Sequence, residues 1–115
     1  MIYKVEAIVR EEVYEDLKDA LNEVEVHGIT VSQVMGCGMQ KGYATNVRGT
    51  KVDINMRPKI KFEIVVSAEE WVEKVVNVIS KVAYTGQIGD GKVFIYPLSD
   101  ALRIRTGQRG AEAIR

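Results

Sequence analysis

The sequence predicts an α+β domain built from two βαβ halves, and three observations support this. Short stretches in which apolar and polar residues alternate predict half-buried strands. Each half also holds one stretch in which apolar residues recur at helical spacing, as in an amphipathic helix. The length of 115 residues, with 46% hydrophobic and 28% charged side chains, is typical of one ordinary globular domain. We therefore expect residues 1–115 to form a single domain.

The first half of the chain predicts a strand, a helix and a second strand. Apolar and polar residues alternate over residues 2–9, which predicts a half-buried strand. Apolar residues then recur at helical spacing over residues 11–26, opposite charged ones, so we expect an amphipathic helix there. After a turn, β-branched residues over 30–35 predict a strand that stops at Gly36.

The second half repeats this order. Alternation resumes after Pro58 and predicts a third strand. Ser67 and Glu70 then fit a capping box, in which a serine oxygen and a glutamate three residues later bind free amides at a helix start. The second helix is expected to end near Thr85, and residues 93–96 predict a fourth strand.

This order of elements is the ferredoxin-like βαββαβ arrangement, in which both helices cover one face of the sheet. Ile8, Val34 and Val65 fall on the minority side of their strands, so the other face is expected to be partly apolar. Such a face can pack against other subunits, although scattered exposed aliphatic residues are also normal.

A long connection separates the second and third strands. Residues 38–57 show no period and are largely polar, and they include Gly38, Gly42 and Gly49. Connections in small domains usually have about four to six residues. We therefore expect residues 38–57 to form a functional loop.

Bulk properties exclude several function classes. The 16 basic and 16 acidic residues leave no net charge, so nothing favours nucleic acid or a membrane surface. The apolar runs are far shorter than a membrane-spanning helix needs. Cys37 is the single cysteine and no secretory signal is visible, which predicts a cytoplasmic protein. With one histidine and one cysteine, no His/Cys metal site can form within one chain.

The strongest local motif is the glycine-rich stretch of residues 85–94. Gly86, Gly89 and Gly91 permit positive φ and a close backbone approach, so that successive amides can converge on phosphate oxygens, with Lys92 as an added charge. The alternative is a plain helix-to-strand turn with a solvated lysine. The stretch is not a Walker A loop, because it precedes a strand and lacks that spacing.

Two further clusters are weaker alone. Arg103 and Arg105 would lie on the same side of an extended segment, a geometry suited to polyphosphate. Together with the glycine-rich stretch they favour a phosphate-bearing ligand. The glycines of residues 36–42 also allow a close backbone approach, but this spacing is unspecific.

Five segments stand in the order found in one known family: residues 36–42 (GCGMQKG), residues 48–49 (RG), residues 58–63 (PKIKFE), residues 85–94 (TGQIGDGKVF) and residues 103–107 (RIRTG). In these segments the chain resembles the PII family of nitrogen-regulatory signal-transduction proteins. The resemblance implies a homotrimer that is not an enzyme, with nucleotide clefts between subunits. In the family's terms, residues 38–57 are the T-loop, 83–92 the B-loop and 97–115 the C-terminal segment.

The resemblance also implies which residues bind ligands. The positions matching the family's ATP or ADP cleft are Gly36, Gly38, Met39, Gln40, Glu63, Thr85, Gly89, Asp90, Gly91, Lys92, Arg103 and Arg105. The positions matching its 2-oxoglutarate site are Gln40, Lys41, Gly42 and Lys59. There a Mg²⁺ bridges the ATP phosphates and the keto acid, with an oxygen of Gln40 as its protein ligand and Lys59 paired with a carboxylate.

The sequence departs from the family at two places. Met39 replaces the usual arginine beside the glutamine, which is expected to weaken or retune ATP binding relative to ADP. Val52 stands where many relatives carry a modifiable tyrosine, so uridylylation at that position is chemically impossible. Arg48 matches the loop arginine with which some relatives plug an ammonium channel. The resemblance implies one of two kinds of target, an ammonium transporter or a soluble nitrogen-metabolism enzyme or regulator. A membrane would be involved only indirectly, through the transporter.

Two alternatives from other classes remain open at the level of sequence. One is a small hydrolase of the acylphosphatase type on the same fold, which would use the glycine-rich stretch as an anion cradle. That chemistry needs an arginine after the first strand, and Arg10 lies there in an acidic context without the accompanying motif. The other is a structural trimer with an interaction loop and no ligand.

Overall fold

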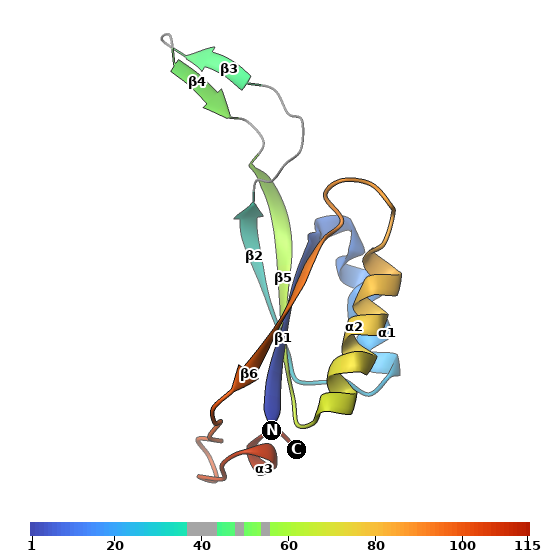
Figure 1. Cartoon of the computed structure of the whole chain (residues 1–115), viewed down its shortest axis with the longest axis vertical. Helices are drawn as coiled ribbons and strands as arrows, with labels where there is room; N and C mark the ends of the chain where they lie inside the picture. Colours follow the sequence, from blue (N-terminus) through green and yellow to red (C-terminus); the bar gives the residue numbers. More distant parts are fainter. Residues whose placement is uncertain (37–43, 48–49, 54–55) are drawn as a thin grey trace.

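A four-stranded antiparallel sheet and two helices packed on it make up the body of the protein, shown by a computed structural model (Figure 1). The structure describes residues 1–36, 44–47, 50–53 and 56–115. In chain order the elements are β1 (Ile2–Arg10), the 3-10 helix η1 (Glu11–Val13), α1 (Tyr14–Glu23), β2 (Ile29–Gly36), β3 (Ala44–Val47), β4 (Thr50–Asp53), β5 (Arg57–Val66), α2 (Glu69–Ala83), β6 (Gly91–Leu98) and α3 (Ala111–Ile114).

The strand order of the main sheet is β2-β5-β1-β6, which confirms the ferredoxin-like prediction. β1 lies in the middle and pairs with β5 on one side and β6 on the other. At one end of the sheet, Arg10 pairs with Lys59 and Val9 pairs with Gly91. This register brings residues that are far apart in the sequence to the same end of the sheet.

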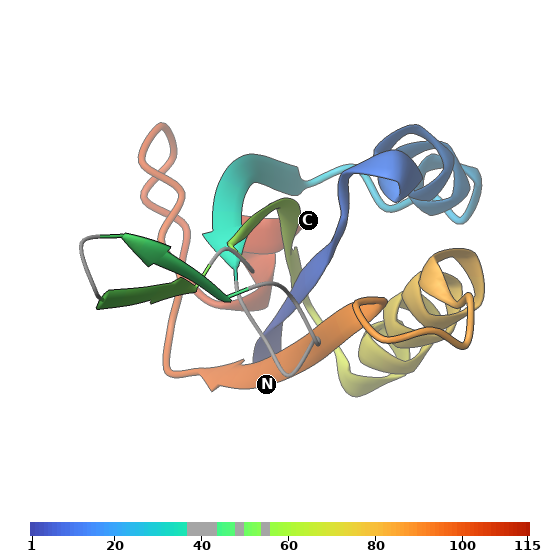
Figure 2. The ribbon, with the colours of Figure 1, turned by 90° about the horizontal axis from the view of Figure 1, so that it is seen from above.

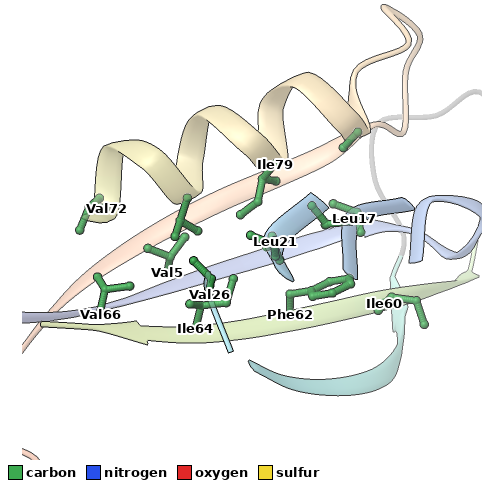
Figure 3. Close-up of a cluster of buried hydrophobic side chains, with 14 residues drawn as sticks. Val5, Leu17, Leu21, Val26, Ile60, Phe62, Ile64, Val66, Val72 and Ile79 are labelled. Atoms are coloured by element: carbon green, nitrogen blue, oxygen red, sulfur yellow. The ribbon is translucent and has the colours of Figure 1, made fainter. Parts of the chain in front are cut away.

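Both helices lie on one face of the sheet, as Figures 1 and 2 show. The odd-numbered residues of β1 and the even-numbered residues of β5 point into the layer between the sheet and the helices (Figure 3). Phe62 and Ile64 are fully buried there, against Leu17 and Leu21 of α1 and Ile79 of α2. Each such side chain stabilises the fold by roughly 1.5–3 kcal/mol through its burial.

Neither α1 nor α2 covers the opposite face of the sheet (Figure 2). Ile8, Val34 and Val65 are half-buried there, as the sequence predicted, and Phe94 and Tyr96 of β6 are 42% and 40% exposed. Lysines and glutamates lie between these apolar side chains. We call this surface the open sheet face, and its composition is mixed.

The segment between β2 and β5 differs from the prediction of a loop without secondary structure. β3 and β4 form an antiparallel hairpin in which Thr45 pairs with Val52 and Val47 with Thr50. β-branched residues favour strands, but four residues are too few for alternation to stand out in the sequence. Figure 1 shows this hairpin beyond the ends of β2 and β5.

The helix starts also differ from the prediction. The first helical segment opens as the 3-10 turn η1, and α1 ends at Glu23. Ser67 does not cap α2: its N-cap is Ala68, in extended backbone and without a side-chain cap. Glu69 and Glu70 in the first turn instead place negative charge at the positive end of the helix dipole. In the described residues, no helix has the length and apolar character to span a membrane.

Candidate functional site

The loop that joins α2 to β6 is closed by one carboxylate. We call residues 85–91 the glycine loop. Asp90 Oδ2 accepts hydrogen bonds from the backbone N–H groups of Thr85 (2.8 Å) and Gly86 (2.9 Å). The Thr85 hydroxyl donates to the other oxygen of Asp90 and accepts the N–H of Gln87 at 3.1 Å. Both ends of the loop are therefore held together by Asp90.

These hydrogen bonds also fix the charge of Asp90. The Thr85 hydroxyl, then the Thr85 and Gly86 amides, lower the pKa of Asp90 from 3.8 to about 2, with a smaller contribution from the Arg10 guanidinium. Asp90 is thus a carboxylate at neutral pH, and its oxygens accept hydrogen bonds from Thr85 and Gly86 of the same loop. The group that Asp90 offers to a ligand is therefore its backbone N–H.

The glycines of the loop have the conformation that their spacing predicted. Gly86, Gly89 and Gly91 have φ values of 86°, 102° and 110°. At Gly91 a Cβ would lie 2.0 Å from the carbonyl oxygen of Ile8 in β1. Only glycine satisfies both the positive φ and this close approach.

Two cations from the sheet hold the carbonyl groups of the loop. Arg10 Nη2 at the end of β1 donates to the carbonyl of Ile88 at 2.6 Å, and its Nε lies 3.6 Å from Asp90 Oδ1. Lys59 Nζ of β5 donates to the carbonyl of Gly89 at 3.0 Å. The loop is therefore tied to two different strands.

These contacts set the direction of the loop amides. The chain has no cis peptide bond among the described residues, so the N–H of Gly89 points away from the carbonyl of Ile88 in the same peptide plane. The N–H of Asp90 points away from the carbonyl of Gly89 for the same reason. Neither amide donates a hydrogen bond to the part of the chain that the structure describes. Adjacent amides of this kind form a concavity that binds anions.

Arg10 is the residue of this site that sequence reasoning missed. Its two partners, Ile88 and Asp90, lie about 80 residues away along the chain. The one available signal was the alternation of side chains along β1, which places Arg10 on the same face of the sheet as Ile8. This alternation does not show which loop reaches that end of the sheet.

Two more predicted residues lie at the same end of the sheet. Lys92 follows the loop in β6 and pairs with Ile8, so it projects from the open sheet face. Gly36 ends β2, and the side chain nearest to a Cβ built there is that of Lys59, at 3.6 Å from its Cγ. The structure thus brings Gly36, Lys59 and Lys92 together with the glycine loop.

The arginines of the C-terminal segment lie at the other end of the molecule (Figure 1). β6 separates them from the glycine loop, and its eight residues span roughly 26 Å at 3.3 Å per residue. Residues 104–106 form a turn, so the expectation of an extended segment is wrong. Arg103 instead binds Gln108 Oε1 at 3.3 Å and the carbonyl of Arg115. Within one chain, Arg103 and Arg105 do not meet the glycine loop.

Glu63 is likewise distant from the loop within one chain. It lies on the open sheet face of β5, where its carboxylate is 3.4 Å from Lys4 Nζ. It lies four positions along β5 from Lys59, which corresponds to roughly 13 Å. The remaining predicted ligand and target residues lie outside the described residues: Gly38, Met39, Gln40, Lys41, Gly42 and Arg48. Val52 lies in β4, and only its backbone is described.

The whole domain matches one known family. The family model described as "Nitrogen regulatory protein P-II" matches residues 2–108. The chain belongs to the P-II family. A "Nitrogen regulatory protein P-II 1" of Methanothermobacter thermautotrophicus is 46% identical over 111 residues, which cover 96% of this chain and 96% of that protein.

Two solved P-II structures resemble this one over nearly its whole length. The complex of Bacillus subtilis GlnK with ATP is 37% identical, with a TM-score of 0.77, and the match covers 97% of this chain and 96% of that one. The P-II protein of Arabidopsis thaliana bound to citrate is 40% identical, with a TM-score of 0.78, and the match covers 99% and 90% of the two chains. These identities confirm the family and the fold.

Membership of the P-II family disfavours the acylphosphatase alternative. That chemistry needs an arginine free to bind a substrate phosphate, whereas Arg10 holds the glycine loop. The described residues also contain no group of three or more His, Cys, Asp or Glu side chains placed to hold a metal ion. The charged side chains that meet the glycine loop from the sheet, Arg10 and Lys59, are cations that suit an anionic ligand.

Proposed function

We propose that this P-II protein is a signalling protein that binds ATP or ADP and, with Mg²⁺, 2-oxoglutarate, and that it acts on a target through the loop of residues 38–57. One observation carries the proposal: the cations Arg10 and Lys59 hold two consecutive carbonyls of the glycine loop. The amides of Gly89 and Asp90 are thereby presented together, as a phosphate group requires.

A nucleotide is the anion that this site fits best. Positive-φ glycines let a phosphate approach the backbone closely, and Lys92 adds charge next to Gly91. The B. subtilis relative is described as an ATP complex, which supports the same ligand class here. Gly89, Asp90, Gly91 and Lys92 are the residues that we propose as the phosphate-binding part of the site.

Lys59 is proposed to hold the dicarboxylate. In the structure it is half-buried and donates to the neutral carbonyl of Gly89. A carboxylate is a stronger partner for an ammonium group than a carbonyl, so a bound acid would compete for Lys59. The citrate complex of the Arabidopsis relative shows a polycarboxylic acid on a related protein and supports this ligand class.

A Mg²⁺ at this site would be held mainly by oxygens of the ligands. The described residues near the glycine loop supply cations rather than carboxylate ligands, and the carboxylate of Asp90 is used within the loop. Mg²⁺ commonly binds through phosphates and few protein groups, which fits this arrangement. We propose Gln40 as its protein ligand, with Lys41 and Gly42 near the acid.

The distance between the two basic clusters supports a site between subunits. Arg103 and Arg105 lie about the length of β6 away from the glycine loop, too far to reach one nucleotide phosphate chain from the same subunit. A second copy packed on the open sheet face would bring its own C-terminal segment and its own Glu63 to the loop. We therefore propose a homotrimer with nucleotide sites between chains.

The proposed output is binding rather than turnover. Gly36, the last described residue before this loop, lies beside Lys59, so we propose that a ligand at Lys59 shifts the population of loop conformers. Arg48 is the proposed contact with the target, an ammonium transporter or a nitrogen-metabolism enzyme or regulator. Because ATP and 2-oxoglutarate are metabolites of the cytoplasm, the proposal implies a cytoplasmic protein.

Isothermal titration tests the ligands. ATP-loaded protein with Mg²⁺ is expected to bind 2-oxoglutarate, and Lys59→Gln or Gln40→Ala is expected to weaken this by about tenfold to a hundredfold, the range for a lost charged hydrogen bond. Lys61→Gln is the matched control, because Lys61 lies on the same face of β5 but pairs with Ile8 rather than meeting the loop. Absence of heat from ATP, or equal acid binding in all three variants, contradicts the proposal.

A further inference from the structure

We infer that Arg10 is a positioning residue for nucleotide binding, acting through the glycine loop and not through the ligand. The inference rests on the proposed function, because it concerns the same site. Arg10 contacts the loop at two points, the carbonyl of Ile88 and the carboxylate of Asp90. Without Arg10, the carbonyl of Gly89 would still be held by Lys59, but the contacts with Ile88 and Asp90 would be lost.

The position of Arg10 suits this role. It is the last residue of β1, and its side chain is 26% exposed, while its Nε is buried and makes no hydrogen bond within the described chain. Nε faces Asp90 Oδ1 at 3.6 Å, an ion pair rather than a hydrogen bond. The guanidinium therefore stays beside the loop because of charge attraction and one short hydrogen bond, with little room to move.

The contact with Ile88 has a direct effect on a ligand-facing atom. When the carbonyl of Ile88 is held toward Arg10, the N–H of Gly89 is held in the opposite direction. Glycine has the widest range of backbone conformations, so the orientation of the Ile88–Gly89 peptide depends on contacts of this kind. Arg10 thus fixes the donor that a phosphate oxygen would accept.

The contact with Asp90 connects Arg10 to the closure of the loop. Asp90 joins the two ends of the loop through Thr85 and Gly86. Arg10 holds this carboxylate on the side of the sheet, so one guanidinium connects β1 to both the tip and the base of the loop. A lysine keeps the charge but cannot make both contacts in this geometry.

Nucleotide titration of charge variants tests the inference. Arg10→Gln is expected to weaken ATP binding by about tenfold or more, and Arg10→Lys by an intermediate factor, while melting temperature reports folding separately. Lys18→Gln removes a cation on α1 that pairs with Glu15, and it serves as the control with unchanged binding. Equal ATP binding by wild type and both Arg10 variants overturns the inference, whereas a wild type that does not bind ATP overturns the proposed function itself.

A double-mutant cycle with Asp90→Asn separates positioning from direct contact. If Arg10 acts through Asp90, Arg10→Gln is expected to have much less effect in the Asp90→Asn background than in wild type. Fully additive losses would overturn this part of the inference, because Arg10 would then act independently of that carboxylate. In the ligand-free protein, the amide resonance of Gly89 is expected to shift in Arg10→Gln and Arg10→Lys but not in Lys18→Gln; an unshifted resonance also overturns it.

Discussion

Gly91 is a residue of the glycine loop that no other amino acid can replace without strain. Its φ is 110°, and any side chain there would meet the carbonyl oxygen of Ile8. Gly91 also pairs with Val9 and so begins β6. One residue thus fixes both the end of the loop and its approach to β1.

Replacing Gly91 is expected to affect stability and binding together. A Cβ 2.0 Å from a backbone oxygen forces the strands apart, and the positive φ adds strain of about 1–3 kcal/mol. We expect Gly91→Ala to lower the free energy of unfolding by at least this amount, measured by urea denaturation, and to weaken ATP binding. Gly28→Ala is the control, since nothing lies within 4 Å of a Cβ there and its φ is not positive. Equal stability of the two variants would contradict this account of Gly91.

Individual residues of the glycine loop differ in how far the sequence predicts them. The spacing of Gly86, Gly89 and Gly91 predicted a backbone with positive φ, and all three have it. Arg10 was missed because its partners are distant in the sequence, and only the strand register brings them together. Local chemistry is readable from spacing, but a contact between β1 and a remote loop requires the fold.

At the scale of one element, the glycine loop behaves as a small folded unit. Four hydrogen bonds within the loop involve Thr85 or Asp90, and two cations attach it to the sheet. The low pKa of Asp90 follows from this network, with the Thr85 hydroxyl as its largest cause. The shape of the loop should therefore depend on the ionisation of Asp90.

The pH dependence follows from the sign of this shift. The pKa of Asp90 is lower in the folded state, so its contribution to stability is complete above about pH 4 and is lost as pH falls toward about 2. Carbon NMR of the Asp90 carboxyl is expected to show ionisation near pH 2. Thr85→Ala should raise this midpoint toward the ordinary value, while Thr106→Ala, which removes a hydroxyl bonded to Gln108, should not. A wild-type midpoint near 3.8 would contradict the hydrogen bonds described here.

The helices and strands were predicted correctly where the periodic pattern of apolar residues extends over many residues. The alternation of β1 and β5 and the apolar faces of α1 and α2 correspond to the observed core. The hairpin of β3 and β4 was missed because each strand has only four residues. The prediction of a capping box at Ser67 was wrong, because α2 begins after Ala68. A local motif does not decide where the preceding strand ends and the helix begins.

In the whole molecule, the basic residues proposed for the nucleotide site lie at two opposite ends of one chain. Arg10, Lys59 and Lys92 gather at the glycine loop, whereas Arg103 and Arg105 lie beyond the far end of β6. The open sheet face carries exposed Phe94 and Tyr96, and neither α1 nor α2 covers it (Figure 2). The proposed self-assembly through this face would account for both features, since it would bury the apolar residues and join the two basic ends from different chains.

Native mass spectrometry of the protein with ATP tests this account most directly. We expect a trimer of about three times 12.9 kDa that carries up to three nucleotides. Phe94→Lys should produce monomers that no longer hold ATP, because assembly and binding share the open sheet face. A wild-type monomer that binds ATP fully, or a trimer that binds none, would contradict a nucleotide site between chains.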